Sequence, residues 1–434
     1  MPPDFAALRP IATELIDVVD AFRDGGFEIH VVGGLVRDLV GERSIDVVDI
    51  DLATDATPEQ VRMLLADRVD AMWRQGERFG TIGVVLGDRK IEVTTYRAEV
   101  YRPDSRKPAV RFSRDLATDL SRRDFTINAM ALTLPDLGLI DPFDGVGDLE
   151  AGVLRTPLDP AISFDDDPLR MLRGARFLAT LRLVPVDGLV PAMAQRAQRL
   201  EIVSAERIGD ELLKLLAVAA PARGLRLLDQ AGLLDVVIPE LSGVDAAHRE
   251  VDLTMVDLVR PVDALWRLAA LYAFVEPEAA GRAGARLRMP RDARHRLRAR
   301  TDAIVSSSEL TAVDLVASRR LASSLGDDRS ALAGVLRARS TALQGAAPDE
   351  AARLIAAAAA IETGWVELAD EDLSSITAGL TGIDVMDELD LQPGPDVGRA
   401  LTWLEEVRYQ EGDLSERELR ARLRAWWGER EAGQ

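Results

Sequence analysis

The sequence lacks cysteine and contains only three histidines, His30, His248 and His295, in 434 residues. Disulfide bonds, thiolate catalysis and zinc–thiolate sites are therefore excluded, and a site that needs several imidazoles is not expected. Long apolar runs are also missing, since none reaches the roughly 18 residues that a membrane helix requires. The opening residues, MPPDFAALRP, do not place a basic segment before an apolar stretch. We therefore expect no signal peptide, no membrane association and a cytoplasmic location.

Lysine is scarce, with three residues against 50 arginines, and codon bias is the simplest explanation for this ratio. The formal net charge of −20 argues against indiscriminate binding to nucleic acid, although it leaves room for a local basic groove. A chain of this length with 47% hydrophobic residues is typical of roughly two to four globular domains.

Strand and helix patterns alternate in the first part of the chain and give way to helical patterns after about residue 155. β-rich runs occur at residues 27–32, 47–53, 81–86 and 90–96. Gly87 and Asp88, between the last two runs, indicate a hairpin. Farther along, Leu, Ala and Arg recur at helical spacing and strand signals are few. The sequence therefore predicts an N-terminal α/β domain followed by an all-helical remainder.

Two glycines follow the first predicted strand in VVGGLVRD, residues 31–38. Gly33 and Gly34 would let a phosphate group come close to the backbone, and the start of the following helix would turn free N–H groups toward it. Arg37, in the first helical turn, is placed to contact the same phosphate. Because a Gly-Gly turn at the end of a strand is more often structural, this motif alone does not establish a phosphate site.

The stretch DVVDIDLAT, residues 46–54, places carboxylates inside an apolar strand. Asp49 and Asp51 share one face because strand side chains alternate, and two neighbouring carboxylates repel each other and are costly to desolvate. A divalent cation such as Mg²⁺ removes that penalty, so the pair is a candidate metal and catalytic site. An exposed edge strand with solvated carboxylates is the alternative. Asp46 is out of phase with the pair and is expected in a loop or cap.

Glu92 occupies the same kind of position in KIEVTTY, residues 90–96, where it stands between Ile91 and Val93 on a predicted strand. A carboxylate at this position is a candidate third acidic residue of the metal or catalytic site. The sequence is equally compatible with a side chain that simply faces solvent.

In SRRDFTINAMAL, residues 121–132, Arg122, Arg123 and Asp124 are expected to open a helix. Asn128 would then lie one turn after Asp124 on the same face. The pair is suited to recognising a hydroxyl group beside a cation, whereas an ordinary capped helix would have the same pattern.

In FDDDPLRMLRGARF, residues 164–177, a helix is expected to begin after the acidic run. Arg170, Arg173 and Arg176 recur every three residues on one face of it. Asp167 and Arg170 supply an acceptor and a planar donor fork, which is what reading the hydrogen-bonding edge of a base requires. The spacing alone favours the plainer interpretation, a helix start with salt bridges.

Residues 281–300 contain eight arginines and one acidic residue in an otherwise acidic protein. This imbalance favours a groove that tracks the backbone of RNA over a solvated helix face. The predicted RNA contacts are Arg288, Arg291, Arg294 and Arg298. A second basic stretch, 417–427, ends in Trp426 and Trp427, for which packing in a core is a better explanation than stacking on RNA.

Six motifs follow one another over residues 28–216: GGLVRD, VDIDLAT, RRDFTINAMAL, DPFDGVGDLEAGVLR, DDPLRMLRGARF and ERIGDELLKLL. In this order they resemble the class II tRNA nucleotidyltransferase and poly(A) polymerase family. Residues 382–423 resemble, more loosely, the tail of its CCA-adding members. The resemblance implies a palm-like α/β head with a mixed β-sheet and helices, followed by an all-α neck, body and tail. The expected bounds are 1–155 for the catalytic head, 156–220 for the neck with the nucleotide-base template, 221–330 for the body and 331–434 for the tail with its tRNA contact.

The family extends the 3′ end of tRNA without a nucleic-acid template. The resemblance therefore implies CCA addition from CTP and ATP by two-metal transfer, with release of pyrophosphate. It assigns Asp49 and Asp51 to two Mg²⁺ ions; Gly33, Gly34 and Arg37 to the triphosphate; Arg122, Arg123, Asp124 and Asn128 to the ribose and nucleotide; and Asp167 and Arg170 to the base edges, with Arg173 and Arg176 in the same nucleotide site.

One position departs from the family pattern, because Asp166 stands where the EDxxR motif has Glu and so shortens that side chain. In the last of the six motifs, Glu206, Arg207 and Glu211 would support the template helix without taking part in the chemistry.

Residues 101–108 resemble the loop that family members need to add the final A, which favours full CCA addition. Poly(A) polymerase, CC-adding and A-adding enzymes stay open as alternatives. A non-catalytic RNA-binding relative is the alternative from a different class, and the presence of both Asp49 and Asp51 argues against it. The sequence makes no prediction of the oligomeric state.

Overall fold

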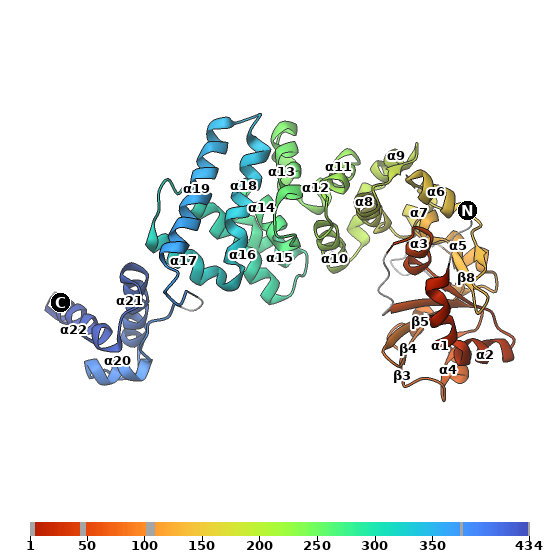
Figure 1. The fold of residues 1–434 in the computed structure, drawn as a ribbon, viewed down its shortest axis with the longest axis horizontal. Helices are drawn as coiled ribbons and strands as arrows, with labels where there is room; N and C mark the ends of the chain where they lie inside the picture. Colours follow the sequence, from red (N-terminus) through yellow and green to blue (C-terminus); the bar gives the residue numbers. More distant parts are fainter. Residues whose placement is uncertain (1–4, 44–48, 101–108, 374–375, 433–434) are drawn as a thin grey trace. The chain divides into compact units, whose positions relative to one another are not determined.

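A computed structural model describes residues 5–43, 49–100, 109–373 and 376–432. The chain divides into two compact units, Met1–Val237 and Ile238–Gln434, and each has hydrophobic clusters of its own (Figure 1). The predicted mixed sheet with helices is confirmed, and the part that follows is mostly helical, with a short strand at Val184–Pro185. The finer division at residues 155, 220 and 330 stays a prediction.

The first unit is built on a seven-stranded mixed sheet with the order β3-β4-β5-β2-β1-β8-β9. Its strands are β1 (Ile29–Val32), β2 (Asp49–Thr54), β3 (Ala71–Trp73), β4 (Thr81–Leu86), β5 (Arg89–Thr95), β8 (Ala131–Thr133) and β9 (Leu139–Ile140). The β4–β5 turn contains Gly87 at a φ of +58°, as the hairpin signal predicted. Strand β2 pairs in parallel with β5 and antiparallel with β1. It is therefore a central strand, and the edge-strand alternative for its carboxylates is wrong.

Alternation along β2 separates a core face from a polar face. Ile50 and Leu52 are buried in the main hydrophobic cluster, together with apolar residues of α2 (Ile16–Asp24) and α4 (Pro58–Leu65). Asp49 and Asp51 point to the opposite face and are reached by solvent. A smaller cluster, including Ala53 and residues of α5 (Leu116–Ser121), covers part of that face. The uncovered part positions the candidate site.

The rest of the first unit is mainly helical. Its further helices are α1 (Arg9–Glu14), α3 (Gly34–Val40), α6 (Gly145–Ala151), α7 (Pro160–Asp166), α8 (Arg170–Leu181), α9 (Leu189–Gln195), α10 (Ala205–Leu216), α11 (Ala222–Gln230) and α12 (Leu234–Val237). Two small sheets pair β6 (Arg97–Val100) with β7 (Ala109–Phe112) and β10 (Val153–Leu154) with β11 (Val184–Pro185). Helix α8 packs on α10 and α11. Gly174 lets α8 approach the ring of Phe125, because a Cβ there would lie 2.9 Å from Cζ.

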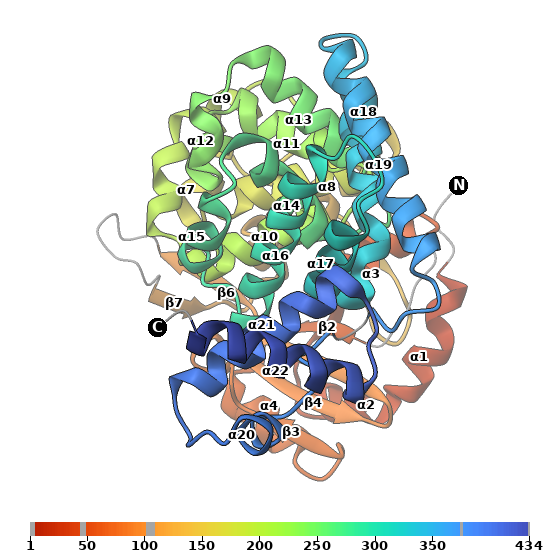
Figure 2. The same ribbon diagram turned by 90° about the vertical axis from the view of Figure 1, so that its left-hand side faces the viewer.

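The second unit consists of helices α13 (Ala246–Leu258), α14 (Ala264–Val275), α15 (Ala279–Arg286), α16 (Arg291–Ser308), α17 (Leu315–Leu325), α18 (Leu332–Leu343), α19 (Pro348–Glu367), α20 (Gly382–Leu389), α21 (Pro395–Glu411) and α22 (Glu416–Ala432). The last three helices pack together around their own apolar cluster (Figures 1 and 2). Trp426 stacks on Trp403 there, with ring centroids 4.9 Å apart, so the core-packing interpretation is confirmed for Trp426. Within the described ranges, every helix is too short or too polar to cross a bilayer.

Candidate active site

A pocket of about 550 Å³ in the first unit gathers the residues that the sequence motifs singled out. It is lined by Gly33, Gly34, Arg37, Asp51, Glu92, Arg122, Arg123, Asp124, Asn128, Asp167, Arg170, Arg173 and Arg176. Asp49 is not among the lining residues, although it precedes Asp51 by two positions on the same face of β2. Residues from β1, β2, β5, the segment after α5 and helix α8 therefore meet in one place, despite their separation in sequence.

The glycine turn after β1 fits the prediction of a strand, two glycines and a helix. Gly33 has a φ of +80°, a conformation that favours glycine, and α3 begins at the next residue. A Cβ at Gly33 would lie 3.3 Å from Oδ2 of Asp51, so the turn also keeps the backbone close to that carboxylate. Arg37 donates through Nη1 to Oδ1 of Asn128 at 2.8 Å and through Nε and Nη2 to Asp38. Its guanidinium is thus fixed at the pocket wall.

Three carboxylates share the polar face of the sheet. Strands β2 and β5 pair so that Asp51 lies beside Glu92. Partial desolvation raises the pKa of Asp51, and the charge of Asp49 adds to this while Arg123 opposes it. Desolvation, with repulsion from Asp51 and Asp49, likewise raises the pKa of Glu92. A cation would relieve this repulsion, and oxygen ligands on one strand face suit Mg²⁺.

Among the described residues, no three acidic or histidine side chains converge closely enough to form a complete metal cage. One or two carboxylates are nevertheless enough for Mg²⁺ when substrate phosphates supply further oxygens. Asp49 and Asp51 therefore fit such an ion, and the catalytic assignment of Glu92 stays a prediction.

The prediction that residues 122–124 open a helix is wrong. Helix α5 begins earlier, because Asp115 caps it by accepting from the N–H groups of Ala117 and Thr118, and it ends at Ser121. The chain then runs through Asp124 into a short 3₁₀ turn, Thr126–Asn128. The side chains still meet, since Nδ2 of Asn128 donates to Oδ1 of Asp124 at 3.0 Å.

Asp124 joins this segment to α8. Its Oδ2 accepts two hydrogen bonds from Arg173, from Nε at 2.8 Å and Nη2 at 2.6 Å. Burial alone would raise the pKa of Asp124, but Arg173 and Asn128 hold it below its usual value. With the Arg37–Asn128 contact, these bonds form a chain of polar side chains from α3 through Asn128 and Asp124 to α8.

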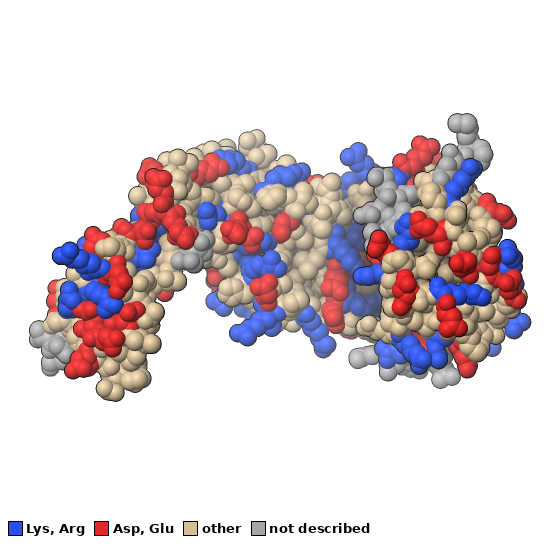
Figure 3. All heavy atoms as spheres, turned by 60° about the horizontal axis from the view of Figure 1, so that its bottom comes forward, with Lys and Arg blue, Asp and Glu red and all other residues tan. Residues whose placement is uncertain are grey.

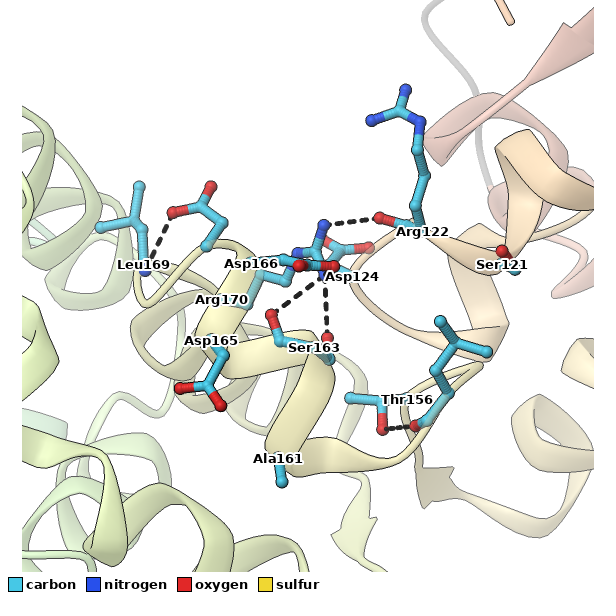
Figure 4. A network of polar contacts seen from close by, with 12 residues as sticks. Ser121, Arg122, Asp124, Thr156, Ala161, Ser163, Asp165, Asp166, Leu169 and Arg170 are labelled. Atoms are coloured by element: carbon cyan, nitrogen blue, oxygen red, sulfur yellow. Dashed lines mark hydrogen bonds and ion pairs between the residues drawn. The ribbon is translucent and has the colours of Figure 1, made fainter. Parts of the chain in front are cut away.

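Arg170 is buried and ties three segments together (Figure 4). Its Nη1 donates to the carbonyl and hydroxyl oxygens of Ser163 at 3.1 and 3.0 Å, and its Nη2 donates to the carbonyl of Arg122 at 2.5 Å. Asp166 lies 4.0 Å away as a weaker ionic partner. These contacts match the salt-bridged helix start that the spacing favoured, although Arg170 also lines the pocket.

Asp167 lies before α8, accepts from the N–H of Leu169 at 3.1 Å and pairs with Arg207 at 2.8 Å. Arg176 pairs with Glu211 at 2.5 Å. Two of the three predicted supporting residues of the ERIGDEL motif, Arg207 and Glu211, thus hold one acidic and one basic residue of the predicted nucleotide site, and Arg207 also lines the pocket.

Sequence reasoning missed several residues of the site. Phe177 lines the pocket and lies within 5.5 Å of the guanidinium carbons of Arg37, Arg173 and Arg176. Its position four residues after Arg173 on a helix was the available signal. The other missed residues are Thr81, Thr94 and Arg97, which line the pocket, and Asp119, which lies behind it. Asp46 and the loop at 101–108 lie outside the described residues.

The basic stretch of the second unit lies mainly on α15 and α16. Acidic partners neutralise five of its arginines: Arg282 (Glu276), Arg286 (Glu240), Arg296 (Asp292), Arg298 (Asp302) and Arg300 (Asp263 and Asp328). In the part of the chain that the structure describes, no ion pair involves Arg288, Arg291 or Arg294. Acidic and basic side chains are interspersed over the face drawn in Figure 3. The RNA-binding assignment stays a prediction.

Comparison with known families gives two matches. Residues 29–155 match the Poly A polymerase head domain, and residues 189–244 match the probable RNA and SrmB-binding site of polymerase A. A CCA-adding enzyme of Streptococcus gordonii is 40% identical over 231 residues, which are 53% of this chain and 56% of that protein. A CCA-adding enzyme of Bacillus licheniformis is 39% identical over 227 residues, 52% and 54% respectively. The chain matches about half the length of these curated relatives.

Among solved structures, a Bacillus stearothermophilus CCA-adding enzyme in complex with CTP is similar over 98% of this chain and 100% of that chain. The TM-score is 0.72 and the sequence identity is 26%. A Thermotoga maritima CCA-adding enzyme complexed with tRNA has the same fold over 96% of each chain, with a TM-score of 0.60 and 20% identity.

Proposed function

Because the chain belongs to the class II CCA-adding enzyme and poly(A) polymerase family, we propose that it adds nucleotides from CTP and ATP to the 3′ end of tRNA. The observation that carries this proposal is the single pocket in which strand carboxylates face arginines from α3, α8 and the segment after α5. The curated relatives, which this chain matches over about half of their length, are CCA-adding enzymes. We therefore favour complete CCA addition, with release of pyrophosphate.

Asp49 and Asp51 are the residues that would hold Mg²⁺. Bound metal ions would supply activation of the attacking 3′-hydroxyl and stabilisation of the departing pyrophosphate in an in-line displacement. The protein's own contribution is to place two carboxylates on a rigid central strand, with Glu92 beside them on β5. The upward pKa shifts of Asp51 and Glu92 are the consequence of that crowding.

The arginines of the pocket would bind the triphosphate and orient the sugar. Arg37, Arg122 and Arg123 line the same pocket as Asp51 and Glu92, and Arg123 is close enough to Asp51 to oppose the rise in its pKa. Asn128 offers a donor and an acceptor for a ribose hydroxyl, since it keeps hydrogen-bonding capacity beyond Arg37 and Asp124. Asp124, whose oxygens already accept from Phe125, Asn128 and Arg173, would hold Asn128 in place within the nucleotide site. The polar chain that joins them to Arg173 would keep these groups in place during the reaction.

The base would be read by side chains at the start of α8. Asp167 supplies acceptor oxygens and Arg170 a planar donor fork, as a protein template for the edges of cytosine and adenine requires. Arg173 and Arg176 would complete this wall of the site. Because Arg170 also holds the carbonyl of Arg122, base recognition and sugar binding would depend on one connected structure.

The RNA would be contacted by helices of the second unit. Arg288, Arg291, Arg294 and Arg298 are the proposed phosphate contacts, and Arg298 would have to exchange Asp302 for a phosphate. The division into head, neck, body and tail at residues 155, 220 and 330 remains part of the proposal. A cytoplasmic location fits a tRNA substrate.

One assay tests this function against its neighbours. The protein is incubated with tRNAs that end before the CCA sequence, after the first C and after CC, with CTP and ATP supplied separately. Stepwise addition of two C and one A supports the proposal, whereas addition of C alone identifies a CC-adding enzyme. Addition of A only after CC identifies an A-adding enzyme, and addition of A alone to any RNA end indicates a poly(A) polymerase. No transfer to any substrate would leave the non-catalytic alternative.

A further inference from the structure

Asp119, on α5, is a buried carboxylate that holds two arginines of the pocket without lining it. Its Oδ1 accepts hydrogen bonds from Nε and Nη2 of Arg122 at 3.2 and 3.0 Å. Its Oδ2 accepts from Nη2 of Arg123 at 3.1 Å. Oδ1 also accepts from the backbone N–H of Arg97 at 3.1 Å. One carboxylate thus fixes two adjacent guanidinium groups and the first residue of β6.

These contacts are made away from solvent, because Asp119 is only 1% exposed. Burial alone would raise its pKa, but Arg123 and Arg122 hold the pKa below its usual value, so Asp119 is a carboxylate at neutral pH. Charge-assisted hydrogen bonds of this kind are stronger than those between neutral groups. Two neighbouring guanidinium groups would otherwise repel each other and sample many rotamers.

Arg123 extends from Asp119 toward the strand carboxylates. Its Nη1 lies 3.7 Å from the point where a Cβ on Gly33 would stand, and Oδ2 of Asp51 lies 3.3 Å from the same point. The positive charge of Arg123 also lowers the pKa of Asp51. Arg123 therefore lies between a buried carboxylate that holds it by a hydrogen bond and a pocket carboxylate that attracts it.

We infer that Asp119 is a positioning residue of the nucleotide site, which holds Arg122 and Arg123 in the orientation that meets a nucleotide's phosphates and ribose. It acts through the arginines and does not touch the substrate. The inference rests on the proposed function, since it assumes that the pocket binds CTP and ATP. Its physical basis is that a bound nucleotide then finds both cations already ordered, so that binding does not have to order them.

Asp119→Asn is the direct test, because it keeps the shape, removes the charge and replaces one acceptor oxygen by a donor. We expect the Kd for CTP and for ATP, measured by calorimetry, to rise at least about tenfold, with a larger rise in KM than fall in kcat. The control is Asp148→Asn. Asp148 is another buried carboxylate of the first unit, which binds Thr126 at 2.7 Å and Arg155 at 3.0 Å and does not line the pocket. Its replacement should leave nucleotide Kd values within about twofold of wild type.

A cycle of variants separates positioning from general loss of structure. The pair Arg122→Gln/Arg123→Gln is measured with and without Asp119→Asn. If Asp119 acts through these arginines, its replacement changes the nucleotide Kd less than about twofold in the doubly substituted protein. An additive effect, or an Asp119→Asn protein that binds nucleotide like wild type, would overturn the inference.

Thermal unfolding of each variant shows whether it is folded. If Asp119→Asn does not fold, Asp119→Glu replaces it, because this variant keeps the charge but displaces both arginines by one methylene. A folded Asp119→Glu protein with unchanged nucleotide Kd would also overturn the inference. Failure of the wild-type protein to extend tRNA would reject the proposed function instead, while the calorimetric result for Asp119 would stand.

Discussion

Asp124 and Arg173 form a two-point ion pair, with N···O distances of 2.8 and 2.6 Å, that joins residues 49 positions apart in the sequence. Asp124 is 8% exposed, so its carboxylate is largely removed from water. It connects the segment after α5 to the helix whose arginines line the same pocket. The geometry of the candidate site therefore depends on contacts between segments that are distant in the chain.

Arg173→Lys tests this connection. A lysine keeps the charge but cannot form both hydrogen bonds of the guanidinium fork, so we expect a loss of about 1–2 kcal/mol in the free energy of unfolding. Urea unfolding measures this loss. Arg155→Lys is the matched control, because Arg155 pairs with buried Asp148 at 3.0 Å while its side chain is 54% exposed. A loss for Arg173→Lys no larger than that of the control would contradict a central role for the pair.

Replacing Gly33 and replacing Gly34 by alanine should change the stability of the protein by different amounts. At Gly33 the φ of +80° is unfavourable for alanine, and its Cβ would lie 3.3 Å from Oδ2 of Asp51. We expect Gly33→Ala to cost about 1–2 kcal/mol of stability. The Cβ of Gly34→Ala would meet only the end of the flexible Arg37 side chain, at 3.4 Å. Thermal denaturation compares the two variants, and equal losses would show that the left-handed turn does not constrain residue 33.

The raised pKa of Asp51 predicts a pH-dependent effect on stability. A carboxyl group whose pKa is raised by folding destabilises the protein at pH values above its folded pKa, and this cost disappears below the unfolded pKa, where both states are protonated. Asp51→Asn should therefore stabilise the metal-free protein near neutral pH, by less than about 1 kcal/mol because the group is reached by solvent. The difference from wild type should vanish near pH 3.

Urea unfolding at several pH values, with a chelator present, measures this difference. The same substitution should abolish nucleotide transfer if Asp51 holds the metal. A stabilisation that grows as the pH falls would contradict the assigned shift, because protonation would then be acting on another group.

The sequence predicted most of the parts of the site but not their contacts. Alternation within DIDL was enough to place Asp49 and Asp51 on one face, because strand period is a local property. The position of Glu92 beside Asp51 depends on how β2 and β5 pair, which the local pattern does not determine. Asp119 was missed for a similar reason, since a helical aspartate is unremarkable until its two arginine partners are seen to line a pocket.

The error at residues 122–124 has a different origin. The run of charged residues resembled a helix start, but Asp115 caps the helix earlier and Phe125 is fully buried. Tertiary packing of Phe125 against α8 therefore overrode a local charge signal. The sequence also did not reveal that Arg170, besides lining the pocket with Asp167, donates to a carbonyl 48 positions away.

The proposed RNA contacts predict a specific dependence on salt. Arg288 and Arg291 are exposed and, within the described ranges, form no ion pair. Each phosphate contact that a substitution removes should make the slope of log K against log salt less negative by about 0.7–0.9. Replacing both residues by alanine should therefore change the slope for tRNA binding by about 1.5 and weaken binding at low salt.

Arg282 and Arg296 provide the control from the same stretch, because Glu276 and Asp292 already neutralise them. Their double alanine variant removes the same formal charge but should change the slope less, since each arginine would have to leave its acidic partner to contact RNA. Filter binding of a tRNA lacking its CCA end, at several salt concentrations, compares the two double variants. Equal slopes would mean that only net charge matters, and a larger change for the control would place the RNA on the paired arginines. Either result would remove the preference for Arg288 and Arg291 as the direct contacts, because a direct phosphate contact should change the slope more than the loss of an arginine that is already paired.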